Sequence, residues 1–115
     1  MDIIIIGSGG HAKVVKDLAE QLNYKIVAVC DPNDSNKNMS FWKDIKFYEK
    51  ESDLKKYDVK KVYMANGIGH KTKNNLLRKK LFILLKRMGF TFPALIHPAA
   101  YVSKDSKLHD GVQVM

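Results

Sequence analysis

The chain has 115 residues, of which 45% are hydrophobic, and it carries a formal net charge of +8. This length and apolar content suit one packed globular unit and exclude an intrinsically disordered chain. No apolar run approaches the roughly 20 residues of a membrane span, and the N-terminal one is too short for a signal peptide. We therefore expect a cytoplasmic protein without membrane insertion. The single cysteine, Cys30, agrees with a reducing compartment.

The positive charge raises the question of a nucleic-acid partner. The 20 Lys and Arg residues are spread along the chain, and aromatic side chains are not interleaved with them as stacking platforms. Solvated helix faces are the favoured interpretation, and no nucleic-acid partner is expected. A mild attraction for anionic ligands is the second interpretation.

The N-terminal third reads as a strand, a turn, a helix and a second strand. Ile3–Ile6 is apolar on both faces and β-branched, which is typical of a buried central parallel strand. Residues 7–10 form a glycine-rich turn, and 11–22 show helical spacing of apolar side chains. Residues 25–30 read as a second buried strand, closed by Asp31 and Pro32. The expected core side chains of the helix are Val14, Val15, Leu18, Ala19 and Leu22.

The middle of the chain is expected to alternate between loops and short elements. Residues 31–44 are polar and rich in turn formers, and 45–48 resemble a short strand. Ser52 or a neighbour is expected to cap a short helix that runs through Tyr57. Residues 59–65 predict a third main strand. Together with the first βαβ unit, this predicts an α/β fold with a small Rossmann-like parallel sheet and flanking helices.

A long helix is predicted from Asn74 to Met88, and Gly89 stands at its expected C-terminal stop. Residues 90–95 are expected to lead into a last strand. The apolar stripe of this helix is predicted to consist of Leu76, Leu77, Lys80, Leu81, Leu84, Leu85 and Met88.

From residue 96 onward the period changes to six. Aliphatic residues recur at Ile96, Val102, Leu108 and Val114, with mostly small residues two positions before each. This is the period of a hexapeptide β-helix, in which three repeats make one turn. We expect residues 1–95 to form a Rossmann-like domain and 96–115 the first turn of a truncated β-helix. Because a solenoid needs several coils to bury its core, we expect the N-terminal piece of a longer protein.

The turn Gly7-Ser8-Gly9-Gly10-His11-Ala12 fits G-x-G-x-x-G/A between a strand and a helix. The glycines allow close approach of a ligand, and the free N–H groups of a helix N-terminus suit phosphate. The alternative is a tight turn that only closes the corner between strand and helix. His11 is either a capping or solvent-facing residue or a donor to phosphate or sugar, and we favour the donor.

Two further stretches are expected to face the same ligand. Asp31 stands about 20 residues after the glycine turn, where dinucleotide-binding folds place a ribose-binding acid. An aspartate before proline is equally typical of a turn, so both interpretations stay open. Asn66 and Gly67 follow the third main strand, and loops at the carboxyl ends of parallel strands converge. The pattern suggests neither a metal site nor a catalytic constellation.

These stretches resemble a known family, the sialic-acid O-acetyltransferases and nucleotide-sugar N-acetyltransferases of the NeuD/PglD type. The resemblance rests on IIIIGSGGHAKVV, on the ANGIG loop, and on GFTFPALIHPAAYVSKDSKLHDGVQV. It implies an N-terminal domain that binds a nucleotide-linked or acidic amino sugar, as in surface glycan biosynthesis. It also implies a C-terminal left-handed β-helix that forms homotrimers, holds acetyl-CoA between subunits and carries a histidine general base.

The resemblance also implies roles for particular residues. Gly9, Gly10 and His11 would contact the phosphates or sugar of the acceptor, and Gly7 and Ser8 belong to the same turn. Asp31 and Pro32 would border the nucleotide, while Asn66 and Gly67 would close over it. The chain departs from the family because the region that carries the catalytic histidine is missing, and because HKTKNNLL is longer than the usual loop. We therefore expect no cofactor and no acetylation by this chain alone.

Two other functions remain open. An NAD(P)-binding oxidoreductase domain is supported by the glycine turn and Asp31, but it leaves the six-residue period unexplained. A non-catalytic truncated module is the third possibility.

Overall fold

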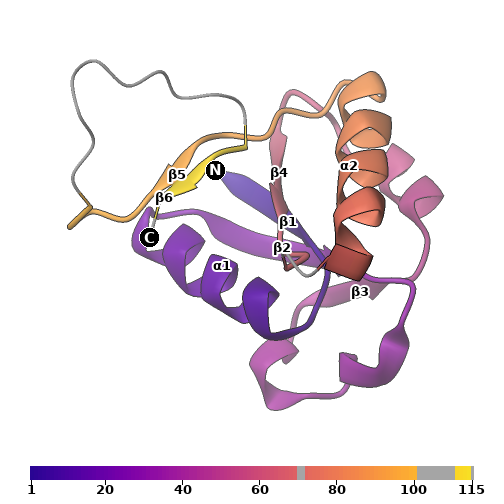
Figure 1. Ribbon diagram of the computed structural model, residues 1–115, viewed down its shortest axis with the longest axis horizontal. Coiled ribbons are helices and arrows are strands. Elements are labelled where there is room, and N and C mark those ends of the chain that lie inside the picture. The colour runs from indigo at the N-terminus through magenta and orange to yellow at the C-terminus, as the bar shows by residue number, and fades with distance from the viewer. Residues whose placement is uncertain (70–71, 101–110, 115) are drawn as a thin grey trace.

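A parallel sheet of four strands forms the centre of the computed structural model, which describes residues 1–69, 72–100 and 111–114. The strand order is β3-β2-β1-β4, so β1 lies inside the sheet and β3 at one edge (Figure 1). The strands are β1 (Asp2–Ile6), β2 (Lys25–Cys30), β3 (Lys46–Tyr48) and β4 (Val62–Asn66). All three pairings are parallel. The α/β class with a Rossmann-like parallel sheet is confirmed.

The isoleucine run is buried on both faces of the sheet. Ile3 and Ile5 pack in one core cluster with side chains of α1 (Gly10–Gln21). Ile4 and Ile6 pack in the other cluster with side chains of α2 (Thr72–Arg87). Successive side chains of a strand point to opposite faces, so a strand between two helical layers must be apolar at every position. The prediction of a central strand is therefore confirmed.

Left-handed residues end both long helices. Gly89 follows α2 with φ of 101°, and its N–H donates to the Lys86 carbonyl at 3.0 Å. The N–H of Phe90 donates to the Leu85 carbonyl at 3.1 Å, which completes a Schellman motif. Asn23 takes the same position after α1 with φ of 67°. The predicted stop at Gly89 is confirmed.

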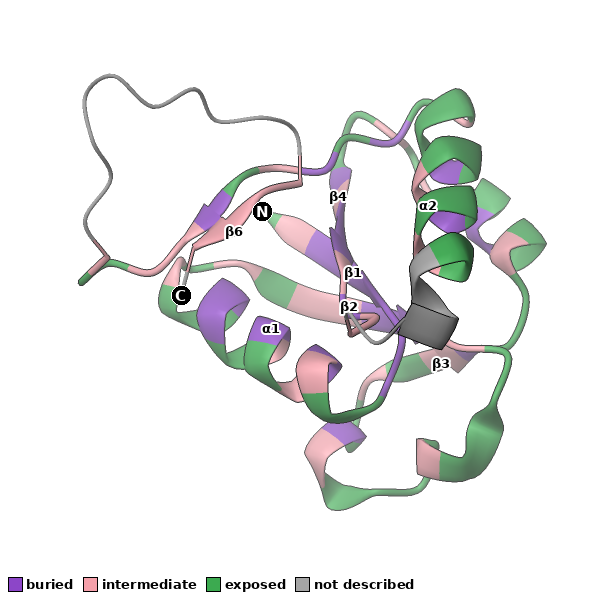
Figure 2. Cartoon of the chain, viewed as in Figure 1, coloured by how far each residue is buried: buried purple, intermediate pink, exposed green. Residues whose placement is uncertain are grey.

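The predicted apolar stripes of both helices are only partly correct. In α1, Val14 is 49% exposed, whereas Val15 is fully buried. In α2, Leu81 and Leu85 are buried, but Leu76 is 69% exposed. Figure 2 shows that most of α2 is exposed and that its buried residues are few. A helix on a sheet buries only one face, and a sequence with more aliphatic residues than that face holds does not reveal which are inside. The other exposed members of the predicted α2 stripe are Leu77, Lys80 and Leu84.

The bounds of other elements also differ from the predictions. The third main strand begins at Val62 rather than Val59, because Asp58 starts a turn in which its carbonyl accepts the Lys61 N–H at 2.9 Å. The short helix after β3 is a 3₁₀ helix, η3 (Glu51–Lys56), and it begins after an N-cap residue that makes no side-chain bond. Ser52 lies inside this helix and does not cap it.

The segment after α2 does not add a full strand to the main sheet. Thr91 forms one isolated parallel bridge with Tyr63. A separate parallel pair follows, formed by β5 (Leu95–Ile96) and β6 (Gln113–Val114). Paired residues are 18 positions apart in sequence, from 95 to 113 and from 96 to 114. Residues 101–110, where much of the expected repeat falls, lie outside the described residues.

The strand pair is seated beside α1 (Figure 1). Leu95 is 1% exposed and belongs to the core cluster that α1 shares with Ile3 and Ile5. Of the helices that the structure describes, none has the length and apolar character to cross a membrane.

Candidate ligand site at the carboxyl ends of the strands

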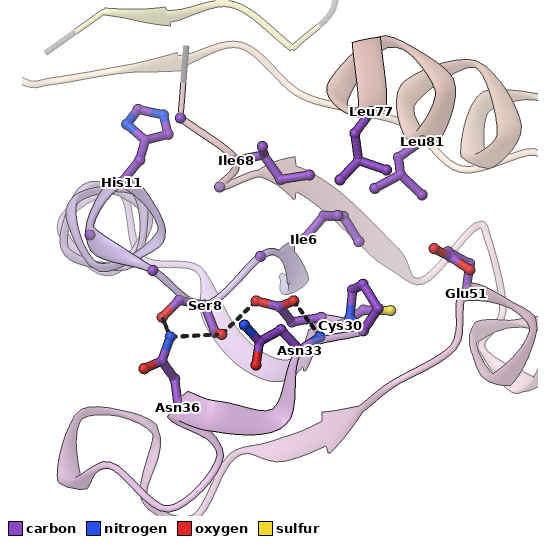
Figure 3. Close-up of a pocket in the computed structure, with 17 residues that line it drawn as sticks. Ile6, Ser8, His11, Cys30, Asn33, Asn36, Glu51, Ile68, Leu77 and Leu81 are labelled. Carbon is purple, nitrogen blue, oxygen red and sulfur yellow. Dashed lines mark hydrogen bonds between the residues drawn. The ribbon is translucent and has the colours of Figure 1, made fainter. Parts of the chain in front are cut away.

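A cavity of about 470 Å³ lies where the carboxyl ends of β1, β2 and β4 meet (Figure 3). From β1 the chain passes through α1 to β2 on one side, while β4 pairs on the other side of β1. Such a switch point is where open α/β sheets bind ligands. The predicted residues that line the cavity are Gly7, Ser8, Gly9, Gly10, His11, Asp31, Pro32 and Gly67. Asn66 does not line it.

Two of the glycines are required by packing. Gly7 has φ of 99°, and a Cβ there would lie 3.2 Å from the Gly67 backbone. A Cβ on Gly67 would lie 2.8 Å from the Ala12 Cβ, so the loop after β4 touches α1 directly. By contrast, a Cβ on Gly9 or Gly10 would meet no atom within 4 Å. These two glycines leave open space at the cavity, where a ligand can approach the backbone.

Ser8 is fully buried and forms several hydrogen bonds beneath the cavity. Its hydroxyl donates to Asp31 Oδ2 at 2.6 Å. Its carbonyl accepts from Asn36 Nδ2 at 3.1 Å and from Trp42 Nε1 at 3.2 Å (Figure 3 shows the bond from Asn36). Asn36 and Trp42 belong to two 3₁₀ turns, η1 (Asp34–Asn36) and η2 (Ser40–Trp42). Ser8 therefore ties the expected loop of residues 31–44 to the glycine turn.

Both oxygens of Asp31 already accept hydrogen bonds. Oδ2 accepts from the Ser8 hydroxyl, and Oδ1 accepts from the Asn33 backbone N–H at 2.9 Å. The second bond is the turn-starting contact that an aspartate before proline favours. A carboxylate has about four acceptor sites, so capacity for a ligand hydroxyl remains. Asp31 acts in the turn, and its contact with a ligand stays a prediction.

The N-terminus of α1 lies at the cavity, which Gly9, Gly10 and His11 line. Gly9 is the N-cap with φ of −84°, and no side chain caps the helix. No acidic residue lies in the first turn. The first N–H groups of a helix lack partners within the helix, and the dipole adds positive potential there. This end of the cavity therefore suits an anion such as phosphate.

The rest of the cavity divides into a polar and an apolar side. Ser8, Asn33 and Asn36 lie together on one side, whereas Ile68 and Leu77 lie on the other (Figure 3). The cavity thus offers hydrogen-bonding groups and an apolar wall to the same ligand. This combination is common in sites for small molecules.

His11 lies at the cavity edge, and its ring points away from Ser8 and Asn33 (Figure 3). Its Nε2 is 3.1 Å from Oε1 of Gln113, a residue of β6. Asn66 accepts at its side-chain Oδ1 from the Ile68 N–H at 3.0 Å, which shapes the loop that closes the cavity. Asn66 itself lines a neighbouring cavity.

Several lining residues were not predicted from the sequence. Asn33 and Asn36 follow the end of β2, and the rule that applied to Asp31 would also have found them. Glu51 comes from η3, and its sequence neighbourhood carries no comparable signal. Cys30 lies at the cavity and is 1% exposed. Burial, together with the nearby carboxylates of Glu51 and Asp31, raises the pKa of its thiol to about 12.

No group of three His, Cys, Asp or Glu residues that could hold a metal ion occurs within residues 1–69, 72–100 and 111–114.

A glycine turn at the switch point of a parallel sheet is typical of a Rossmann-like domain. A family model described as the PglD N-terminal domain matches residues 2–85. The chain belongs to this family. The resemblance to sugar acyltransferases of the PglD type, which the glycine turn and the C-terminal stretch suggested, is thereby confirmed.

Solved structures of acetyltransferases have the same fold. One is the acetyltransferase domain of PglB from Neisseria gonorrhoeae in complex with acetyl coenzyme A. Its sequence is 28% identical to this chain, and the two structures match with a TM-score of 0.81. The match covers 99% of this chain and 52% of the PglB domain. Another is PerB from Caulobacter crescentus in complex with CoA and GDP-perosamine. Its sequence is also 28% identical to this chain, and the structures match with a TM-score of 0.79. The match covers 100% of this chain and 51% of PerB. The chain thus spans about half the length of these structures.

Proposed function

We propose that this chain is the acceptor-binding part of an acetyl-CoA-dependent sugar acetyltransferase. Its acceptor is a nucleotide-linked amino sugar or a related acidic amino sugar of surface glycan synthesis. The observation that carries the proposal is the cavity at the switch point, where the uncapped N-terminus of α1 meets open space at Gly9 and Gly10. The structure of PerB, a protein similar to this chain, contains GDP-perosamine.

The cavity suggests an arrangement for this acceptor. The phosphates would accept from the N–H groups at the start of α1, beside Gly9 and Gly10. The nucleoside would lie along Asp31 and Pro32, where polar groups are available. Gly67 belongs to the loop after β4 and would close over the acceptor. Asn66 would act indirectly, since its side chain accepts from the Ile68 N–H within this loop.

The remaining parts of such an enzyme are proposed to lie on a β-helix that begins near residue 96, after a Rossmann-like domain of residues 1–95. Support comes from the parallel pairing of β5 with β6 at a separation of 18 residues, which equals three hexapeptide repeats. Acetyl coenzyme A, the general base and trimer contacts are assigned to that β-helix. Further support is that the matched structures are about twice as long as this chain and that the two described above hold acetyl-CoA or CoA.

Asp31 supports one competing function, an NAD(P)-binding domain. The residue stands at the end of β2, where a ribose-binding acid is placed in dinucleotide-binding folds. Its oxygens also accept from Ser8 and Asn33, and these bonds leave acceptor capacity for a ribose hydroxyl. The binding experiment below includes NAD for this reason.

Calorimetry on this chain tests the proposal with UDP, GDP, a UDP-4-amino sugar, CMP-sialic acid, free sialic acid and NAD. We expect selective binding of a nucleotide sugar. Gly10→Ala is the informative variant, because Gly10 lines the cavity and a Cβ there would meet no protein atom within 4 Å. It should weaken binding by about tenfold or more while leaving the thermal unfolding temperature unchanged or raised, since alanine favours helix.

Val14→Ala is the matched control for Gly10→Ala, because Val14 is on the exposed side of α1. It should leave binding unchanged. Preferential binding of NAD would replace the proposal with the oxidoreductase alternative. If none of the six compounds binds, the assignment of this cavity as an acceptor site in the isolated chain is wrong.

A further inference from the structure

Three distant segments meet at one side-chain amide beside the cavity. Gln113 of β6 contacts His11 of α1 at 3.1 Å and donates from Nε2 to the Asn66 carbonyl of β4 at 2.8 Å. The partners are 102 and 47 residues away in sequence. His11 lies in the first turn of α1, and Asn66 is the last residue of β4, before the loop that contacts the start of α1. Gln113 therefore links the start of α1 to the end of β4.

The chemistry of these groups determines which atoms carry hydrogen. A backbone carbonyl only accepts, so the Gln113 atom that faces Asn66 must be the NH₂ group. The Gln113 oxygen then faces His11, and this oxygen also only accepts. The hydrogen between them must therefore lie on His11 Nε2. In the neutral imidazole, Nδ1 is then the nitrogen with the lone pair.

The loop after Asn66 begins next to this contact, and its Gly67 N–H donates to the Ile6 carbonyl at 2.7 Å. The Asn66 side chain accepts from the Ile68 N–H, and Gly67 and Ile68 line the cavity. Gln113 itself is held by the pairing of β6 with β5. There the N–H of Leu95 donates to the Val112 carbonyl at 2.7 Å and the N–H of His97 donates to the Val114 carbonyl at 2.6 Å.

We propose that Gln113 is a positioning residue of the ligand site. It fixes His11 as the Nε2–H tautomer and holds the loop after Asn66 at the cavity. The C-terminal strand pair is thereby part of the ligand site, although it adds no strand to the main sheet. This inference deepens the proposed function and rests on it for the identity of the ligand, but the tautomer of His11 does not depend on any ligand.

Nitrogen-15 NMR of the histidine rings, on the whole chain without ligand, tests the tautomer. At a pH where His11 is neutral we expect the Nε2–H form, assigned by comparison with His11→Ala. Gln113→Ala should shift the ring towards a mixture of tautomers. The inference is overturned if wild-type His11 is the Nδ1–H form, or if Gln113→Ala leaves the tautomer unchanged.

Two further variants separate this role from general stability. Gln21→Ala changes the only other glutamine, which is exposed at the end of α1, and it should leave the His11 spectrum unaltered. Gln113→Glu keeps an oxygen acceptor for His11 but loses the donor to the Asn66 carbonyl. It should keep the Nε2–H tautomer and still weaken ligand binding. If Gln113→Ala does not fold, the wild-type and Gln113→Glu tautomers decide the question.

A double-mutant cycle then measures the coupling to the ligand, with the nucleotide sugar that binds the wild type as probe. His11→Ala and Gln113→Ala should each weaken binding by about tenfold, and the double variant by little more than either. Additive losses would overturn the coupling. If the wild type binds no nucleotide sugar, the proposed function fails, whereas the NMR result still decides the role of Gln113.

Discussion

Ser8 shows how a residue in a ligand-binding motif is used by the protein itself. The sequence places it in the glycine turn among residues expected to contact a ligand. In the structure it is fully buried, and its hydroxyl donates to Asp31 while its carbonyl accepts from Trp42. Ser8, the first variable position of the G-x-G-x-x-G/A motif, therefore connects the glycine turn to the loop after β2.

The first prediction concerns the hydroxyl of Ser8. Ser8→Ala should lower the free energy of unfolding by about 1.5–3 kcal/mol, because a buried hydrogen bond to a carboxylate is lost. Chemical denaturation followed by the fluorescence of Trp42, the only tryptophan, measures this directly. Ser52→Ala is the matched control, because Ser52 is exposed and caps no helix, and it should change stability by less than about 0.5 kcal/mol. Equal losses in both variants would contradict the assignment.

The second prediction concerns the thiol of Cys30, whose pKa is raised from 9.0 to about 12. Little thiolate forms at neutral pH, so we expect the native protein to react with a disulfide reagent far more slowly than the protein in denaturant. Because the folded-state pKa lies above 9.0, the stability due to the neutral thiol is complete below pH 9. It is lost as the pH rises towards 12. Fast labelling of the native chain at pH 8 would contradict this.

At the scale of the elements, the two long helices were predicted in type and approximate extent, but not in orientation. The apolar residues of α2 exceed what one face can bury. Packing against the sheet buries Leu81 and Leu85, whereas Leu76 stays exposed. The N-terminal run of isoleucines did not have this ambiguity, because a strand between two helical layers buries every residue.

The third prediction uses this difference within α2. Leu85→Ala should destabilise the protein by about 2–5 kcal/mol, since it opens a cavity in the core beside Ile4 and Ile6. Leu76→Ala makes the same chemical change on the exposed face of the helix. It should alter stability by less than about 0.5 kcal/mol. Thermal or denaturant unfolding compares the two, and a similar loss at both positions would mean that the helix packs by another face.

At the scale of the whole molecule, the described part of the chain contains two parallel sheets that share a core cluster. Leu95 of β5 packs with Ala12 and Val15 of α1 against Ile3 and Ile5 of the main sheet. The second sheet therefore depends on the first, while the first has its own core on both faces.

The fourth prediction tests this dependence through Leu95→Ala. Amide hydrogen exchange at Leu95 and His97, whose N–H groups pair with β6, should become faster. The loss of a buried leucine side chain should lower the free energy of unfolding by about 2–5 kcal/mol. The exchange rate in β1 should rise only by the amount that this overall loss of stability explains. Uniform acceleration across both sheets would instead show that they unfold as one unit.

What the sequence determined by itself are the features set by local patterns. For the isoleucine run, the glycine turn and Gly89, a few neighbouring residues are enough to determine the backbone conformation. Most of the cavity could be predicted because loops at the carboxyl ends of parallel strands must converge. Only the tertiary structure decided which face of α2 is buried and that Ser8 is internal. It alone brought Gln113 to His11. Those outcomes depend on contacts between residues far apart in the chain, and no local pattern encodes such a contact.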